Sequence, residues 1–447
     1  MSRSVPEGHG LTPVPRSVSG DLASAEVISE LMSETVLPNG VHVLSERIPG
    51  VRSAAVGVWV RQGGAHETAS QNGASHLLEH MVFKGTERRT AAEIALSIES
   101  LGGSLDAYTT REHTAYQARV LDEHLDTALD VLADLVLDPK LTEEDLTLER
   151  EVVLEEIAQV EDTPDDLVFE THSERMWRGH AYGRPILGTE ESVSEMSADT
   201  LRALHGARYR GDNLVVAAAG NVDHAAFTEE VERLFGHRTG AERADPVDSP
   251  GESARGTDHL ARETAQTHIV FGAPGPARAH EDRYPLILLS SALGGGMSSR
   301  LFQRVREEMG LCYSVFSYQS FYSMAGSLGV YVGTRPATAD AAVDAISEEL
   351  DRVAREGLPA AEVEQAKQQM KGQIMLSLES TGARLHRLAS LALHREPFLG
   401  LDGLLKRIDA VSEDDIARVA RRYFDPAGHF VLRLGPDGLA SSDVGDA

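Results

Sequence analysis

The sequence is poor in cysteine and in long apolar runs, and each shortage excludes a class of protein. Its 447 residues include a single cysteine, Cys312, so an intrachain disulfide and a cysteine-rich zinc module are both excluded. No apolar run approaches the roughly 18 residues that a membrane-spanning helix needs. We therefore expect a globular protein of a reducing compartment that does not use a membrane as its partner.

Positive charge is also scarce. Lysine and arginine together number 42 against 70 aspartates and glutamates, which gives a formal net charge of −28. A surface this acidic repels phosphate backbones, so nucleic acid is a poor candidate for the partner, whereas cationic ligands suit it. Residues 1–31 lack the apolar core of a secretory signal, and we expect a cytoplasmic location in a bacterium.

The length and composition indicate two domains. Apolar residues make up 41% and charged residues 25%, which is ordinary for a globular chain of this size. Breaks rich in glycine, proline, serine and charge divide the chain. The predicted divisions are a flexible tail 1–33, a first domain 34–236, a linker 237–262, a second domain 263–436 and a flexible tail 437–447.

The two predicted domains share a sequence pattern near their C-terminal ends. A helix beginning after Ser197 leads into Tyr209, a turn and an apolar strand, and the same order follows Ser412 and includes Tyr423. We interpret this as an internal duplication. Strands and long helices are mixed, and several strands are joined as hairpins, which predicts an α+β fold of two homologous domains. Each would be a mostly antiparallel sheet packed with helices.

The sharpest local signal is the run His76-Leu77-Leu78-Glu79-His80. On a helix, residues at positions i, i+3 and i+4 share one face. His76 and His80 can therefore bind one Zn²⁺ while Glu79 lies beside the open coordination position as a base. The alternative is a polar helix face that carries two histidines and an incidental acid.

A catalytic zinc site needs a third protein ligand. Thr142 is predicted to cap a helix that runs to about residue 160 and carries several acids. Glu149 and Glu156 are seven residues apart, close to two helical turns, so they project from the same face. Periodicity by itself does not choose Glu156 over Glu155 as the ligand.

At these residues the chain resembles the pitrilysin/insulinase-type zinc metallopeptidases, and among them the mitochondrial processing peptidase-like branch. The resemblance runs from about Leu37 to Leu434. The motifs that carry it are His76–His80, Phe83–Thr86, Gly102–Thr109, Glu149–Glu156, Gly188 within Ile186–Thr189, and Gly294–Val315.

The resemblance implies roles for the residues of the first half. It makes His76, His80 and Glu156 the ligands of Zn²⁺, and the same ligands would accept Co²⁺ or Mn²⁺. It makes Glu79 the general base, and it makes Glu149 the acid that supports the site from behind a ligand.

The second half lacks this histidine motif and carries a glycine run, Gly294–Gly296, instead. No Gly-Lys-Ser/Thr follows, so a phosphate-binding loop is a poor interpretation, and close backbone packing or a turn is a better one. Further along, Arg306 and Tyr313 match the family's Arg-x₆-Tyr pair, which implies that they hold the substrate carbonyl and stabilise the oxyanion. Taken alone, they would be a surface residue and a core residue.

The resemblance also makes residues 103–110 the edge strand to which an extended peptide substrate adds. Asp106, Ala107 and Tyr108 are the central residues of this strand. The family usually has asparagine at the position of Asp106, so this departure changes one side-chain contact to the substrate.

Partner expectations depend on the number of domains. Long members of the family hold four homologous domains that close like a clamshell, whereas this chain has two. We expect a homodimer in which Arg306 and Tyr313 act on the partner's zinc site, with a heterodimer containing an inactive paralogue as the alternative. The rival functions are a non-catalytic processing-peptidase-like subunit and an unrelated scaffold module.

Overall fold

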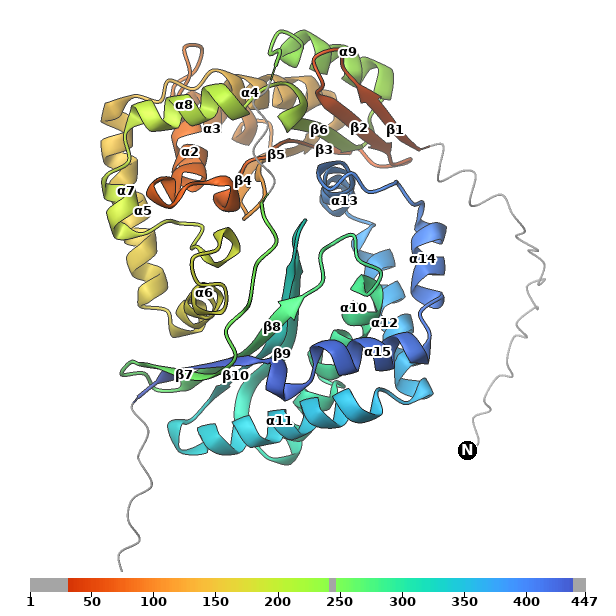
Figure 1. Ribbon diagram of the computed structural model, residues 1–447. Helices are drawn as coiled ribbons and strands as arrows, with labels where there is room; N and C mark the ends of the chain where they lie inside the picture. Colours follow the sequence, from red (N-terminus) through yellow and green to blue (C-terminus); the bar gives the residue numbers. More distant parts are fainter. Residues whose placement is uncertain (1–30, 241–246, 437–447) are drawn as a thin grey trace, which may run out of the picture.

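The computed structural model describes residues 31–240 and 247–436, which fold into two sheet-and-helix halves (Figure 1). The first sheet has six strands in the order β1-β2-β6-β3-β5-β4. Its β2–β6 pair is parallel, and its other pairs are antiparallel. The strands are β1 (Met32–Val36), β2 (His42–Arg47), β3 (Ser53–Val60), β4 (Ser104–Thr109), β5 (Thr114–Leu121) and β6 (Leu214–Gly220).

The second sheet repeats this topology with one strand fewer. Its order is β7-β11-β8-β10-β9, and β7–β11 is its parallel pair. Its strands are β7 (Gly256–Ala261), β8 (Thr267–Gly275), β9 (Cys312–Phe321), β10 (Gly326–Thr334) and β11 (Phe430–Gly435). Tyr209 follows the helix before β6, and Tyr423 ends the helix before β11, so the matching tyrosines occupy equivalent places. The predicted α+β fold with a duplicated domain is confirmed.

Helices cover both sheets. The first half contains α2 (Ala74–Val82), α3 (Ala91–Glu99), α4 (Leu125–Leu137), α5 (Glu143–Glu161), α6 (Pro164–Met176), α7 (Glu190–Ser194), α8 (Ala198–Arg208) and α9 (His224–Phe235). The second half contains α10 (Arg283–Gly294), α11 (Ala339–Glu356), α12 (Ala360–Ser377), α13 (Thr381–Leu393), α14 (Leu401–Asp409) and α15 (Glu413–Tyr423). Thr142 caps α5 through a hydrogen bond from the Asp145 amide, as the sequence predicts. In the described ranges, no helix combines the length and apolarity needed to cross a membrane.

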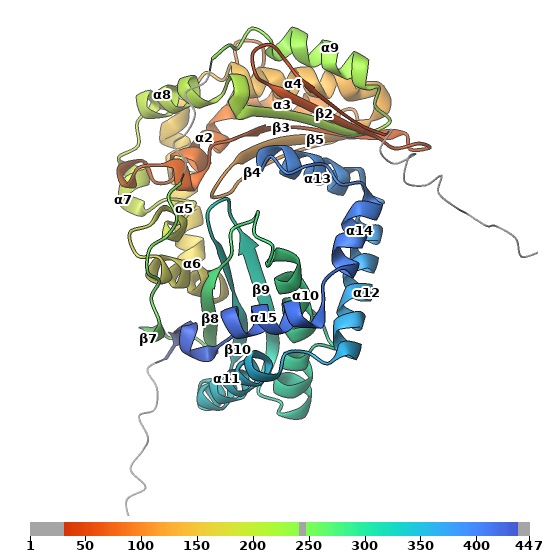
Figure 2. The same cartoon turned by 45° about the vertical axis from the view of Figure 1, so that its right-hand side comes forward.

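The two halves each lend one helix to the other's sheet. Helix α13 lies against β2, β3 and β6 of the first sheet, on the face opposite α4, and Figure 2 shows it beneath that sheet. Helix α6 of the first half packs in the same way against β8 and β11 of the second sheet. Leu385 and Leu388 of α13 are fully buried against Trp59 and its neighbours on the first sheet. Burial of apolar surface therefore binds the halves together.

The exchange of helices leads to a stability prediction. Leu388→Ala should lower the free energy of unfolding by about 2–5 kcal/mol, because it leaves a cavity between α13 and the first sheet. The midpoint of urea unfolding measures this loss. Leu96→Ala on α3 is the control, since Leu96 is 61% exposed. Equal shifts for the two variants would show that α13 is not part of the cooperative core.

The structure bears on three predicted boundaries. The predicted tail 1–33 is too long, because β1 begins at Met32 and pairs with β2, while residues 1–30 lie outside the described residues. The linker 237–262 is wrong at its end, because it contains β7. This strand is at the sheet edge and mostly exposed, so it carries no apolar alternation, and its hydrogen bonds come from distant β11. The tail 437–447 also lies outside the described residues.

Candidate metal centre

Helix α2 begins at a tightly built junction. Gly73 and Gly188 both adopt positive φ angles, and a Cβ on Gly188 would lie 2.6 Å from the Asn72 carbonyl oxygen. The buried carboxylate of Glu67 accepts hydrogen bonds from the amides of Gly73 (2.8 Å) and Ser75 (2.6 Å). An acid at a helix N-terminus satisfies free amides and complements the helix dipole. These contacts fix where the helix starts, and with it the direction of its histidines.

Three potential metal ligands converge on this helix. His76 and His80 lie one turn apart, and Glu156 reaches them from α5. Glu156 Oε2 lies 3.6 Å from His76 Nε2, and Glu156 Oε1 lies 3.7 Å from His80 Nε2. One ligand atom from each of the three residues lies within 4.8 Å of the other two. The structure therefore selects Glu156, since Glu155 is exposed on another face of α5.

Glu149 supports His80 from behind. The Nδ1 of His80 donates to Glu149 Oε2 at 3.2 Å, and Lys84 forms an ion pair with the other carboxylate oxygen. A hydrogen bond at Nδ1 leaves the lone pair of Nε2 facing Glu156, which is the tautomer that a metal requires. Glu149 is buried, so its carboxylate holds the ring in a defined direction.

Glu79 lies on the same turn of α2 with its carboxylate largely buried. Thr109, the last residue of β4, donates its hydroxyl hydrogen to Glu79 Oε2 at 2.5 Å. Burial raises the pKa of Glu79, and the hydrogen bond from Thr109 opposes that shift. A carboxylate that is partly desolvated and held by one hydrogen bond is suited to accept and return a proton.

The donor set fits a zinc ion. Two imidazole nitrogens and one carboxylate oxygen are the three protein ligands of a typical catalytic zinc site, which leaves one position open. Burial lowers the pKa of His76 to about 4, which keeps the ring neutral and able to bind a metal. The buried Nδ1 of His76 has no hydrogen-bond partner in the described part of the chain, so this ring is not committed to another network.

The predicted substrate strand, β4, is an edge strand of the first sheet. β4 pairs with β5 on one side, and no described strand pairs with its other edge. Leu105 and Ala107 point toward the hydrophobic core between the first sheet and helices α2 and α4. Tyr108 faces α13 and accepts a hydrogen bond from Trp59. Asp106 is exposed, with its side chain on the same face as that of Tyr108.

Arg306 and Tyr313 lie together in the second half. Arg306 is on a π-helical segment, Phe302–Glu308, and its guanidinium stacks over the rings of Phe302 and Tyr313 at 4.5 and 4.8 Å. Tyr313 is 77% exposed, so it is not the core residue that a tyrosine taken alone would suggest. In residues 31–240 and 247–436, the contacts of this pair do not include the histidines or Glu156. Gly294 packs against the Ser317 backbone, in keeping with a structural role for the glycine run.

Sequence reasoning missed Thr109 and Lys84 as parts of the site. Both belong to motifs that carry the family resemblance, but the sequence assigned no role to either side chain. Thr109 is 30 residues from Glu79, and Lys84 is 65 residues from Glu149, so no local spacing relates either pair. Only the packing of β4 against α2, and of α2 against α5, brings them together.

Comparison with known families agrees with this geometry. Residues 42–190 match the sequence model described as insulinase (peptidase family M16), and residues 195–370 match the model described as the peptidase M16 inactive domain. The first match contains the histidine motif and Glu156. The second lies mostly in the half without that motif.

Individual relatives cover most of the chain. An uncharacterised zinc protease of Streptomyces coelicolor is 42% identical over 87% of this chain and 86% of its own length. One from Bacillus subtilis is 42% identical over 86% of this chain and 94% of its own length. A protease structure from Helicobacter pylori superposes with a TM-score of 0.84 at 22% identity, covering 91% of this chain and 99% of that one.

Proposed function

Because this chain belongs to the insulinase family of peptidases, M16, we propose that it is a zinc-dependent endopeptidase of the bacterial cytoplasm. Its substrates would be peptides and unfolded or precursor segments. One observation carries the proposal: the ligand atoms of His76, His80 and Glu156 lie within 4.8 Å of one another, and Glu79 lies on the same helix turn. The single cysteine favours a reducing compartment.

Each residue of the site has a defined part in peptide hydrolysis. His76, His80 and Glu156 would hold Zn²⁺, which when bound would supply the Lewis acidity that polarises a peptide carbonyl and lowers the pKa of the attacking water. Glu79 takes the proton of that water and delivers it to the leaving amine. Thr109 orients the Glu79 carboxylate, and Glu149 orients the His80 ring.

One edge of β4 pairs with no strand of the described residues, and this edge supports binding of an extended peptide. The backbone groups along this edge can add the substrate as a further strand, which is a recognition mode that depends little on substrate sequence. The last residue of β4 contacts Glu79, so a peptide on this edge would pass the catalytic base. An acidic chain would favour basic peptides.

The activity as a peptidase is tested by metal removal. Purified protein should hydrolyse a mixed fluorogenic peptide library, lose that activity with a chelator and regain it on addition of zinc, because the ligands remain in place. Metal content is measured alongside the rates. Zinc binding without any hydrolysis would indicate a missing partner chain, and the absence of both would contradict the proposal.

We further propose that Arg306 and Tyr313 act across a cavity formed by a homodimer. They lie in the half without the zinc motif and contact each other, where a guanidinium and an exposed phenol can donate to a developing oxyanion. A second copy would bring this pair to a zinc site that lies in the other chain's first half. A heterodimer with an inactive paralogue would use the same arrangement.

Mixing inactive chains tests this arrangement. Glu79→Gln chains retain Arg306 and Tyr313, and Tyr313→Phe chains retain a complete zinc site, so a mixture should recover up to about a quarter of parent activity by random pairing. Hydrolysis is followed after the chains have been allowed to exchange. Two Tyr313→Phe preparations mixed together are the control. No recovery in the first mixture, with exchange shown by mass spectrometry, would argue that the pair acts within one chain.

A further inference from the structure

A strongly basic cavity lies in the second half, beside the start of α10, the end of α13 and α14. Its volume is ≈ 520 Å³, within the range of small-ligand pockets. The acids that line it are Glu281 and Glu396. The basic cavity is defined by its arginines, which are Arg278, Arg283, Arg387, Arg395 and Arg407. In a chain with a net charge of −28, five guanidinium groups around one cavity are unexpected.

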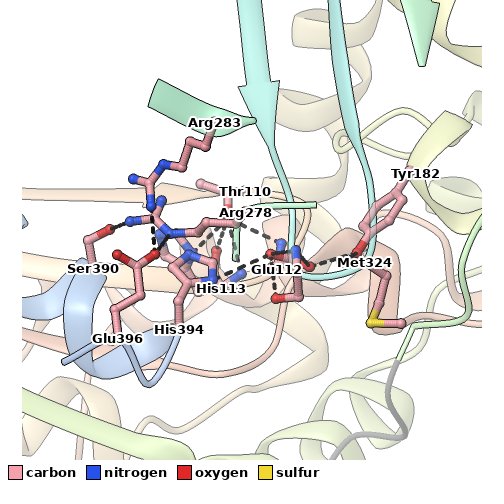
Figure 3. Close-up of polar contacts among 11 residues, drawn as sticks. Thr110, Glu112, His113, Tyr182, Arg278, Arg283, Met324, Ser390, His394 and Glu396 are labelled. Carbon is pink, nitrogen blue, oxygen red and sulfur yellow. Dashed lines mark hydrogen bonds and ion pairs between the residues drawn. The ribbon is translucent and has the colours of Figure 1, made fainter. Parts of the chain in front are cut away.

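The acids present do not saturate these arginines. Glu396 Oε1 accepts from both Arg278 Nε (2.5 Å) and Arg283 Nη1 (2.8 Å), so two guanidinium groups share one carboxylate (Figure 3). The Nε of Arg283 is buried and has no hydrogen-bond partner among the described residues. Arg395 and Arg407 are exposed at the cavity's rim. The cavity therefore retains positive charge and donors that an anion could use.

The positive charge of the cavity also lowers the pKa values of two neighbouring histidines. Burial and then the charge of Arg278 lower the pKa of His394, which lines the cavity, to about 3. The same two causes lower the pKa of His113, on the loop after β4, to about 4. Both rings are neutral near pH 7, so the arginines are the source of the positive charge.

Much of the remaining lining is apolar, although His280, Ser390 and His394 also contribute to it. Tyr284, Ile287, Ile374, Leu391 and Leu404 form walls beside the guanidinium groups. A compact hydrophilic anion would leave these walls against water, whereas a ligand with an anionic head and an apolar body would cover both kinds of surface. A carboxylate matches the planar fork of a guanidinium, which can donate two parallel hydrogen bonds.

We propose that the basic cavity binds a carboxylate carried on an apolar body, either the free C-terminus of a peptide that ends in apolar residues or a medium-chain fatty acid. The cavity lies close to the predicted substrate strand. Tyr108 of β4 hydrogen-bonds to His386 of α13, and α13 supplies Arg387 to the cavity. A bound peptide end would thus lie near β4, but the proposal does not depend on catalysis.

A binding experiment without turnover tests the proposal. Full-length Glu79→Gln protein, stripped of metal by chelator, is titrated against a fluorescent peptide that ends in two leucines, as the free acid and as the C-terminal amide. Fluorescence anisotropy should show the acid binding at least about tenfold more tightly than the amide, as expected for one charge-assisted hydrogen-bonded pair. Competition by dodecanoate, with dodecanol as the uncharged control, reports the fatty-acid source. Equal binding of acid and amide, without competition by dodecanoate, would overturn the proposal.

Variants at the rim locate the site. Arg395→Gln combined with Arg407→Gln changes two exposed side chains and should remove most of the preference for acid over amide. The matched control is Arg119→Gln combined with Arg335→Gln, which changes two exposed arginines outside the cavity. This control variant should keep the preference for acid over amide. Arg283→Gln, tested separately, removes the buried donor. A preference that survives both the rim variant and Arg283→Gln would place the site elsewhere and refute the assignment.

Discussion

Glu79→Gln should lower kcat for peptide hydrolysis by a factor of about 10²–10⁴, which is the usual contribution of a general base. The amide has nearly the same shape as the carboxylate but cannot take a proton from water. Glu79 is not among the three residues whose ligand atoms converge, so the variant should keep its zinc. Initial rates on a fluorogenic peptide that the parent protein cleaves measure the loss of kcat, and zinc content measured alongside shows whether the ion is retained.

Glu99→Gln is the matched control for this variant. Glu99 is an exposed glutamate at the end of α3, and its replacement removes the same charge from the chain. We expect the control to keep the parent rate. A Glu79→Gln protein that retained its zinc and more than about a tenth of the parent kcat would show that another group serves as the base.

Glu156→Gln should weaken zinc binding by more than about 100-fold, because even partners that only support a ligand typically contribute 10- to 100-fold. The variant removes the single anionic ligand and leaves two neutral imidazoles to hold the ion. Hydrolysis should fall in parallel at limiting zinc and recover partly at high zinc. Zinc affinity is measured by competition with a chelator of known strength.

Glu155→Gln tests whether position or charge matters at this helix. Glu155 precedes Glu156 on α5, carries the same charge and is exposed, so its replacement should leave zinc affinity unchanged. Equal losses in the two variants would mean that the general negative field of α5 holds the ion. A loss confined to Glu155→Gln would contradict the assignment of Glu156 as the ligand.

Local sequence features were sufficient for the elements that carry the site. His76, Glu79 and His80 share a helix face because of the helical period, and that inference uses only five consecutive residues. Thr142 caps α5 as predicted, because a cap depends on residues within one turn. The duplicated α+β fold was also predictable from the sequence, through the repeated order of a helix, a tyrosine and a strand.

Contacts between distant segments were decided only by the tertiary structure. The convergence of Glu156 on His76 and His80, the hydrogen bond from Thr109 to Glu79 and the ion pair of Lys84 with Glu149 all join separate elements. Their geometry depends on how α2, α5 and β4 pack, and no short-range period encodes that packing.

The same distinction explains the predicted boundaries that were wrong and the cavity that was missed. Strand β7 exists because β11, far along the chain, offers it hydrogen-bonding groups, while its own exposed residues show no apolar alternation. The basic cavity draws arginines from segments more than a hundred residues apart. This sequence by itself determined which helices form and which chemistry-bearing residues share a face, because those depend on neighbours within a turn or two. The tertiary structure decided which distant side chains meet, because burial and pairing across the chain have no local signature.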